Sequence, residues 1–332
     1  MMKNFRTMWI ILISCLFSMM LILNVWVGTA SAQSQKKSKK QFCSEINGKF
    51  KEFGWNRIIC NPDRWETYDY SSKGNPLLYQ EFGFDNNNSN VPVNLVLCGV
   101  HGDEPTAIYQ CFHMVREILF DNKQSKDNFK LVVAPIVNPD GFFMNTRVNA
   151  NGIDVNRNMP TRDWEKYAHK LWSRKNDPRR FPGKSAGSEI EAKMQAFLID
   201  KYRPDKILSF HAPLGFLDFD GPGDRKNSNL LRVERRAKRV GFRIEKNTNQ
   251  FLKFIDFRFY PGSLGNYAGN EKEIPTYTVE LPSVQASRAH EYWKIMRLAL
   301  IKAMSYEIYD DKQYKPVIIS QNTHDVVWNK SY

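Results

Sequence analysis

Four short apolar segments, separated by stretches with helical spacing, constrain the fold of this chain more than any other feature. Each has the length and composition of a buried strand, and they cover residues 93–100, 130–137, 206–210 and 276–281. Helices are expected at 105–120, 190–201, 229–240 and 285–306, with a further strand near 77–84. Strands that alternate with helices predict a single α/β domain with a mixed, largely parallel central sheet flanked by helices.

The chain begins with a segment typical of an export signal. Lys3 and Arg6 precede an apolar run over residues 8–27, and Ala30-Ser31-Ala32 has the small-residue pattern after which signal peptidase cuts. We therefore expect residues 1–32 to be a signal peptide and the rest to be exported, periplasmic or secreted. The alternative is an uncleaved anchor, because an apolar run of this length can cross a bilayer once.

The composition and net charge limit the kinds of binding partner that the chain can have. The chain has 332 residues, 42% of them hydrophobic, and a formal net charge of +13, which suits one large domain that attracts anions. Nucleic acid is one such anion, but export argues against it and favours an anionic cell-wall polymer or lipid surface. No stable membrane association is expected after signal cleavage. The basic run 36–40 is interpreted as a solvated linker, with weak surface attraction as the alternative.

Cysteines outside the signal segment form two pairs along the sequence. Cys43 and Cys60 lie in residues 33–64, which we interpret as a polar lead-in. In an oxidising compartment they are expected to form a disulfide, and the alternative is two free thiols. Cys98 falls in a predicted strand and Cys111 on the following helix, so both are expected to be small buried hydrophobic residues.

Two histidines and a glutamate have the chemistry of a metal site. His101 and Glu104 lie three residues apart where a buried strand turns into a helix, and His211 ends another buried strand. Zinc binds such nitrogen and oxygen ligands, and three protein ligands leave a fourth position for water. Taken singly, each residue has an ordinary structural explanation: a helix cap for Glu104 and a buried structural histidine for His211.

Further polar residues follow the other strands. An irregular loop over 138–158 carries Arg147, Asn156 and Arg157, and arginine binds carboxylates through two parallel hydrogen bonds. The alternative is a set of turn-stabilising asparagines and aspartates with surface arginines. Glu280 stands within an apolar strand, where a carboxylate is costly to bury without a partner or a role. It is therefore a candidate general base, or one half of a strand-end salt bridge.

The order of these motifs resembles the zinc carboxypeptidase family, typified by carboxypeptidase A. The resemblance covers roughly residues 75–305 and rests on His101-x-x-Glu104, Asn138-Pro139-Asp140-Gly141, Arg147, Asn156-Arg157-Asn158, His211 and Glu280. Within the family the chain looks most like the bacterial murein peptide amidases, through the segments around Arg147, His211-Ala212-Pro213-Leu214 and Pro261-Gly262-Ser263. The expected organisation is a zinc peptidase catalytic domain over 65–310 and a tail over 311–332.

The resemblance implies roles for individual residues. One Zn²⁺ would be held by His101, Glu104 and His211, with Glu280 moving the proton and Arg147 stabilising the developing oxyanion. Asn156 and Arg157 would clamp the carboxylate of the released residue. The family also carries a mobile tyrosine ahead of the Gly-Ser segment; Tyr260 is assigned to it, although the spacing places Phe257 closest. Asp218 and Asp220 are expected either to meet a diaminopimelate ammonium or to be solvated loop acids.

Three functions are weighed on this basis. The first is hydrolysis of an amide bond in peptidoglycan peptides, between γ-D-glutamate and meso-diaminopimelate, which export and positive charge suit. The second is a secreted carboxypeptidase that removes C-terminal residues from proteins or peptides. The third, from another class, is a non-catalytic wall-binding protein on a decayed peptidase scaffold. The third is disfavoured because every ligand and the base are kept.

Overall fold

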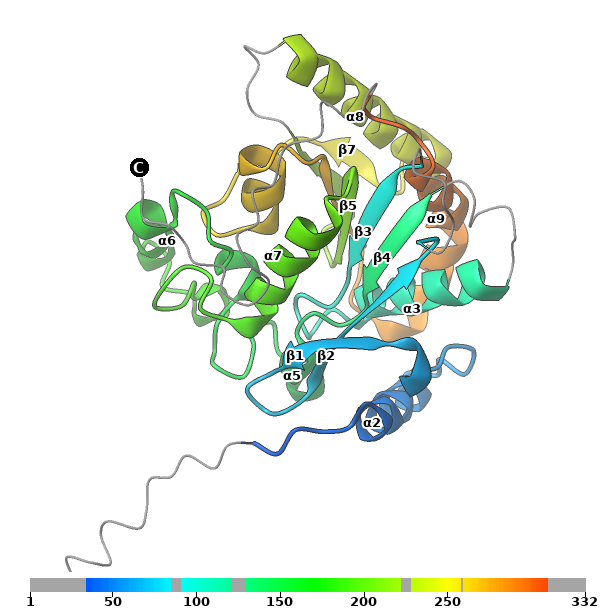
Figure 1. The fold of residues 1–332 in the computed structure, drawn as a ribbon, viewed down its shortest axis with the longest axis vertical. Helices are drawn as coiled ribbons and strands as arrows, with labels where there is room; N and C mark the ends of the chain where they lie inside the picture. The colour runs from blue at the N-terminus through cyan, green and yellow to red at the C-terminus, as the bar shows by residue number, and fades with distance from the viewer. Residues whose placement is uncertain (1–33, 85–90, 121–128, 222–227, 258, 310–332) are drawn as a thin grey trace, which may run out of the picture. The chain divides into compact units, whose positions relative to one another are not determined.

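A mixed sheet forms the centre of the computed structural model (Figure 1), which describes residues 34–84, 91–120, 129–221, 228–257 and 259–309. Within these segments the sheet has the order β1-β2-β4-β3-β5-β8-β6-β7. The strands are β1 Glu66–Tyr70, β2 Pro76–Phe82, β3 Val93–Leu97, β4 Lys130–Ala134, β5 Lys206–His211, β6 Phe216–Asp220, β7 Lys253–Ile255 and β8 Thr276–Glu280. The central strands β4, β3, β5 and β8 run parallel, so the predicted fold class is confirmed.

Helices cover both faces of this sheet, which explains why the central strands read as continuous apolar runs. Leu95 and Leu97 of β3 belong to one hydrophobic core, while Val96 and Cys98 belong to the other. The first core includes buried residues of α7, and the second includes residues of α2, α3, α8 and α9. The helices span α2 Lys39–Glu52, α3 Pro105–Phe120, α5 Pro139–Met144, α6 Trp164–Ser173, α7 Ile190–Tyr202, α8 Ser228–Asn247 and α9 Ala289–Met304.

The lead-in over residues 33–64 contains an amphipathic helix, α2, with a buried apolar face, so its interpretation as a merely polar stretch is wrong. Ser38 caps α2, and its capping box with Gln41 satisfies backbone groups at the helix start. Phe42, Cys43, Ile46 and Phe50 are buried on one face. Lys39 Nζ donates to the Trp65 carbonyl at 2.7 Å. The basic run is therefore largely a helix start rather than a linker, and the described residues from Lys36 to Tyr309 belong to one compact unit.

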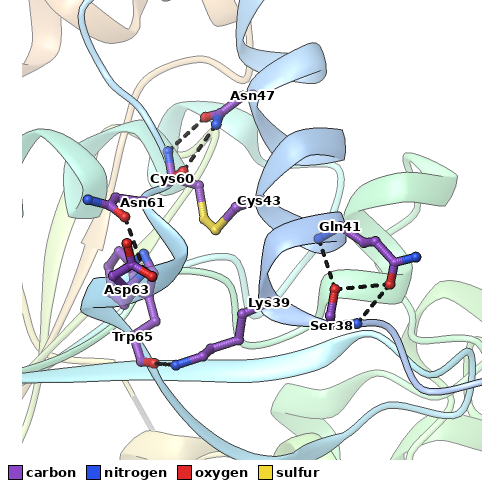
Figure 2. Close-up of a disulfide and its surroundings, with 9 residues drawn as sticks. All are labelled: Ser38, Lys39, Gln41, Cys43, Asn47, Cys60, Asn61, Asp63 and Trp65. Atoms are coloured by element: carbon purple, nitrogen blue, oxygen red, sulfur yellow. Dashed lines mark hydrogen bonds between the residues drawn. A yellow bond between two sulfur atoms is a disulfide. The ribbon is translucent and has the colours of Figure 1, made fainter.

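Two disulfides are present. Cys43 of α2 is bonded to Cys60, the pairing expected from the sequence (Figure 2). Asn47 fixes the same segment, because its side chain accepts from the Cys60 amide at 2.7 Å and donates to the Cys60 carbonyl at 3.1 Å. Cys98 is bonded to Cys111, so the expectation of two separate apolar side chains is wrong. This second bond ties the end of β3 to α3.

Other expectations differ from the structure at element boundaries. Strands β1, β6 and β7 were not predicted, because they are short and partly exposed. Helix α8 continues to Asn247, beyond the expected end at residue 240. The expected signal peptide and C-terminal tail lie outside the described residues. Among the described helices, none is both long and apolar enough to cross a bilayer.

Removing the Cys98–Cys111 bond tests this part of the structure. Closing a loop of this sequence separation, 13 residues, stabilises a protein by about 3 kcal/mol through the entropy of the unfolded chain. The double variant Cys98→Ala/Cys111→Ala should therefore lose at least that much free energy of unfolding in denaturant titrations without reductant. A double variant as stable as the parent would contradict the bond. Cys43→Ala/Cys60→Ala is the matched comparison.

Candidate metal centre and substrate site

His101 and Glu104 are brought together by the turn between β3 and α3. His101 Nδ1 lies 2.8 Å from Glu104 Oε1, and both side chains are buried. The turn packs closely on α5: a Cβ at Gly102 would lie 1.9 Å from the Gly141 carbonyl carbon. Glycine is therefore required at residue 102, because any side chain would push the turn, with its two functional residues, away from α5.

His211 reaches the same point from the end of β5. Its Nδ1 lies 3.1 Å from His101 Nδ1 and 3.1 Å from Glu104 Oε2. One ligand atom from each of His101, Glu104 and His211 lies within 4.8 Å of the other two. Donor atoms around a tetrahedral zinc ion are roughly 3.3 Å apart, given Zn–N distances of about 2.0–2.1 Å. The donor set, its burial and its spacing therefore fit zinc.

Asp154 supports this cluster, and sequence reasoning gave it no role. It is fully buried, and its Oδ1 lies 3.2 Å from His101 Nε2 while its Oδ2 accepts from Arg147 Nε at 3.0 Å. Burial alone would raise the pKa of Asp154, but the Arg147 guanidinium and His101 outweigh it and hold the pKa well below its usual range. A carboxylate on the outer nitrogen of a metal-binding histidine fixes the ring's orientation.

Glu280 ends β8 beside these residues, since its Cα pairs with that of His211 in the parallel register of β5 and β8. Its Oε2 is buried and has no hydrogen-bond partner in the described part of the chain. Burial, with a contribution from the nearby Glu104 charge, raises the pKa of Glu280 above its ordinary value. The side chain is thus biased toward accepting a proton.

The predicted arginines converge on the same site. Arg147 Nη1 lies 3.0 Å from His101 Nδ1 and 3.6 Å from Glu104 Oε1. The Arg157 guanidinium stacks on the Tyr260 ring at 4.0 Å, and its Nη1 donates to the Asn156 carbonyl at 2.6 Å. The buried Nε of Arg157 has no partner among the described residues. An unmet arginine donor of this kind suits a carboxylate ligand.

Asn156 and Tyr260 lie next to Arg157, whereas Phe257 packs on Phe216 instead. The Asn156 side chain accepts from the Leu264 amide at 2.8 Å, which ties the Gly-Ser segment to the arginine loop. Phe257 packs on Phe216 with ring centroids 5.2 Å apart and is 55% exposed. The assignment of Tyr260 rather than Phe257 thus agrees with the contact to Arg157.

Three asparagines of the loop over 138–158, Asn138, Asn149 and Asn158, hold its backbone in place. Asn138 Oδ1 accepts from the Gly141 amide at 2.8 Å and caps α5. Asn149 Nδ2 donates to Glu189 at 2.7 Å, and Asn158 Nδ2 donates to the Pro182 carbonyl at 2.8 Å. These asparagines fix the backbone of the loop, and Arg147 and Arg157 of the same loop lie at the site.

Asp218 and Asp220 lie on β6, so the interpretation as solvated loop acids is wrong. Asp218 Oδ1 accepts from the Phe257 amide at 3.0 Å. Asp220 pairs with Thr276, four residues before Glu280 on β8, which places its Cα roughly 13 Å from the Glu280 Cα along the strand. Asp220 therefore lies away from the metal cluster along β8.

Asp220 is buried and has no hydrogen-bond or ion-pair partner among the described residues. Burial, with the charges of Asp218 and Asp256, raises its pKa well above the ordinary value. Its carboxylate lies against Gly265, where a Cβ would be 1.9 Å from Asp220 Oδ2. Gly265 follows Leu264, whose amide binds Asn156. The unpaired carboxylate is thus linked through two residues to the segment that carries Arg157.

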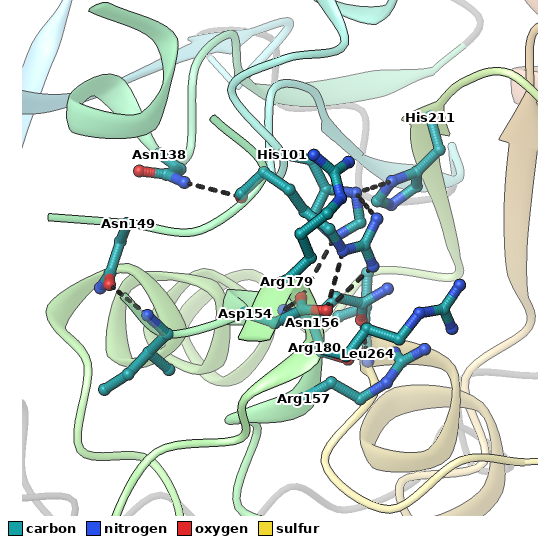
Figure 3. Close-up of polar contacts among 12 residues, drawn as sticks. His101, Asn138, Asn149, Asp154, Asn156, Arg157, Arg179, Arg180, His211 and Leu264 are labelled. Carbon is teal, nitrogen blue, oxygen red and sulfur yellow. Dashed lines mark hydrogen bonds and ion pairs between the residues drawn. The ribbon is translucent and has the colours of Figure 1, made fainter. Parts of the chain in front are cut away.

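Two more arginines, which sequence reasoning missed, stand beside the site (Figure 3). Arg179 and Arg180 end the short 3-10 helix η3, Pro178–Arg180. Arg179 Nη2 forms an ion pair with Asp103 Oδ2 at 2.8 Å, next to Glu104 in sequence. Their signal in the sequence was a Pro-Arg-Arg-Phe-Pro segment within a long irregular stretch, where spacing alone gives no reason to single them out.

A buried cluster of two imidazoles and a carboxylate at the carboxyl ends of parallel strands defines a metallopeptidase of the zinc carboxypeptidase type. The chain belongs to the zinc carboxypeptidase family, whose model matches residues 59–285. The resemblance seen in the sequence is thereby confirmed. The chain is accordingly a metallopeptidase-type hydrolase, and the family is a zinc family.

Individual relatives agree with this membership. The chain is 33% identical over 226 residues to murein peptide amidase A of Vibrio campbellii, covering 66% of this chain and 80% of that protein. Its fold is similar to murein-tripeptide amidase MpaA from Escherichia coli O157, with TM-score 0.50, 22% identity and coverage of 74% and 92%. It is also similar to carboxypeptidase A from Helicoverpa armigera, with TM-score 0.57, 17% identity and coverage of 87% and 80%.

Replacing Asp154 tests whether it orients His101. The variant Asp154→Asn keeps the volume but removes the charge that pairs with Arg147, so zinc affinity should fall by about 10–100-fold. Titration against a competing chelator measures the change. Asp69→Asn, an exposed aspartate on β1, is the control and should bind zinc as the parent does. Equal zinc affinity of the parent, Asp154→Asn and Asp69→Asn would show that Asp154 does not support the metal site.

Proposed function

We propose that this chain is an exported enzyme with one zinc ion that hydrolyses an amide bond in peptidoglycan peptides, between γ-D-glutamate and meso-diaminopimelate. The observation that carries the proposal is the convergence of His101, Glu104 and His211 on one point, with Glu280 beside them. Family membership and a relative named as a murein peptide amidase support the substrate class.

Zinc, when bound by these three residues, supplies Lewis-acid chemistry that activates water and polarises the scissile carbonyl. Glu280 accepts the proton of the attacking water and delivers it to the leaving amine, for which its raised pKa suits it. Arg147 stabilises the negative charge that develops on the carbonyl oxygen. Asp154 holds Arg147 and His101 in place for this step.

Asn156 and Arg157 bind the carboxylate of the amino acid that is released. The Nε of Arg157 is a donor without a partner among the described residues, and the Tyr260 ring covers the guanidinium. Burial, together with the Arg147 and Arg180 charges, lowers the pKa of Arg157, so a bound anion relieves repulsion among these cations. A diaminopimelate residue provides that anion through its carboxylate.

Asp220 binds the side-chain ammonium of diaminopimelate. Its carboxylate is buried, has no partner among the described residues, and lies against Gly265, away from the metal cluster along β8. Burying an unpaired carboxylate is costly, and an ammonium brought by the substrate offsets that cost. Asp218 has a backbone partner instead, so the ammonium is assigned to Asp220 alone.

Export is supported by the chemistry of the four cysteines in the described residues, since all of them are in disulfides. Such bonds persist in oxidising compartments and are rare in the cytosol. The signal-like segment over 1–32 agrees with this. The second candidate, a secreted carboxypeptidase acting on protein C-termini, shares the metal cluster and the carboxylate clamp, but an ordinary apolar C-terminal residue gives Asp220 no partner.

Glu280→Gln tests the mechanism, and two substrates test the specificity. The parent enzyme should hydrolyse L-Ala-γ-D-Glu-meso-diaminopimelate far faster than a protein-derived peptide with ordinary α-linkages. The variant should keep its zinc but lose about 10²–10⁴-fold in kcat, because the general base is gone. Products are identified by mass spectrometry. Faster cleavage of the α-linked peptide would favour the carboxypeptidase, and an active variant would refute the assigned base.

Asp220→Asn tests the ammonium subsite. The parent should prefer the diaminopimelate peptide about 10–100-fold over a matched peptide with 2-aminopimelate, which lacks the side-chain amine, because a charged hydrogen bond is lost. The variant should lose this preference while Asp218→Asn, on the same strand, retains it. Ratios of kcat/KM for the two peptides give the measurement. A preference unchanged in Asp220→Asn would place the ammonium elsewhere.

A further inference from the structure

Arg179 and Arg180 are fixed beside the metal centre by the backbone around them. The Asp177 side chain caps η3 by accepting from the Arg179 amide at 3.0 Å. The Phe181 carbonyl accepts from the Asp154 amide at 2.8 Å. This backbone bond joins η3 to the segment that carries Asp154, Asn156 and Arg157. The two arginines are therefore held next to the site rather than on an independent surface loop.

Their guanidinium groups remain available for a ligand. Arg179 is 61% exposed while paired with Asp103, and Arg180 is 53% exposed, with Asp177 at 3.6 Å as its ion-pair partner. Figure 3 shows both side chains together with Arg157 and Asp154. Arg179 adjoins the turn that carries Glu104, and Arg180 is close enough to Arg157 to lower its pKa.

The roles already proposed assign no substrate group to these two arginines, whose ion pairs with Asp103 and Asp177 leave both guanidinium groups more than half exposed. Arg147 faces the reacting carbonyl and Arg157 takes the carboxylate of the released residue. A second pair of guanidinium groups beside Arg157 adds like-charge repulsion, which a second substrate anion would relieve. Arginine is the side chain best suited to carboxylates because its donors bind both oxygens.

The proposed substrate has an anion in the required place. γ-Linked D-glutamate keeps its α-carboxylate free, on the acyl side of the scissile amide and a few carbon atoms from the carbonyl. An ordinary α-linked peptide has no carboxylate at that position. We infer that Arg179 and Arg180 form a second carboxylate subsite, which recognises the free α-carboxylate of γ-linked D-glutamate. This inference rests on the proposed function and assigns specificity within it.

The experiment compares two peptides that differ only in this group: L-Ala-γ-D-Glu-meso-diaminopimelate and its D-isoglutamine counterpart, in which the α-carboxylate is a carboxamide. The parent should prefer the acid by about tenfold in kcat/KM, the effect of one charged hydrogen bond. The double variant Arg179→Gln/Arg180→Gln should lose this preference by slowing on the acid alone. Arg174→Gln, an exposed arginine just before η3, is the matched control and should behave as the parent.

The outcomes separate this inference from the function on which it rests. Equal hydrolysis of both peptides by the parent, or a preference retained by the double variant, overturns the subsite and leaves the amidase proposal intact. A double variant that slows equally on both peptides also counts against it, since general damage does not discriminate between them. If the parent cleaves neither peptide, the amidase proposal fails and the inference fails with it.

Discussion

The parallel register of β3, β5 and β8 determines where the side chains of the metal centre lie. Leu97 pairs with Ser209, and His211 pairs with Glu280, so the three strands end at one edge of the sheet. The turn after β3 then places His101 and Glu104 against His211. Because parallel strands deliver their carboxyl ends to a common edge, residues more than a hundred positions apart meet there. A shift of one residue in any of these strands would turn a required side chain to the opposite face.

Oppositely charged side chains lie in contact around the metal cluster. Asp154 binds both His101 and Arg147, so one buried carboxylate sets the orientation of a metal ligand and of a cation that faces the substrate. Arg157 and Arg180 lie on one side of the cluster, while Asp220, a carboxylate without a partner among the described residues, lies farther along the sheet. A substrate with carboxylates near its scissile bond and an ammonium at the end of a side chain complements this distribution. Electrostatic complementarity of this kind mainly sets specificity.

Much of this arrangement could be predicted from the sequence, for identifiable reasons. The central strands are covered on both faces and are therefore almost uniformly apolar. This pattern allowed β3, β4, β5 and β8 to be predicted from the sequence, together with the functional residues at their carboxyl ends. Short, partly exposed strands such as β6 lack that signal, so Asp218 and Asp220 were expected in a loop. The helical spacing of Phe42, Ile46 and Phe50 was present but was obscured by the basic residues around it. Asp154, Arg179 and Arg180 act through contacts made only when distant loops pack together, and no local pattern reveals such contacts.

The metal centre itself is tested most directly by a crystal structure of the purified protein, with anomalous diffraction recorded on both sides of the zinc absorption edge. We expect one zinc peak, bonded to Nδ1 of His101, Nδ1 of His211 and a carboxylate oxygen of Glu104, with Glu280 alongside but not bonded to the metal. A zinc ion held by other residues, or a zinc-supplemented protein with no peak among these three side chains, would contradict it.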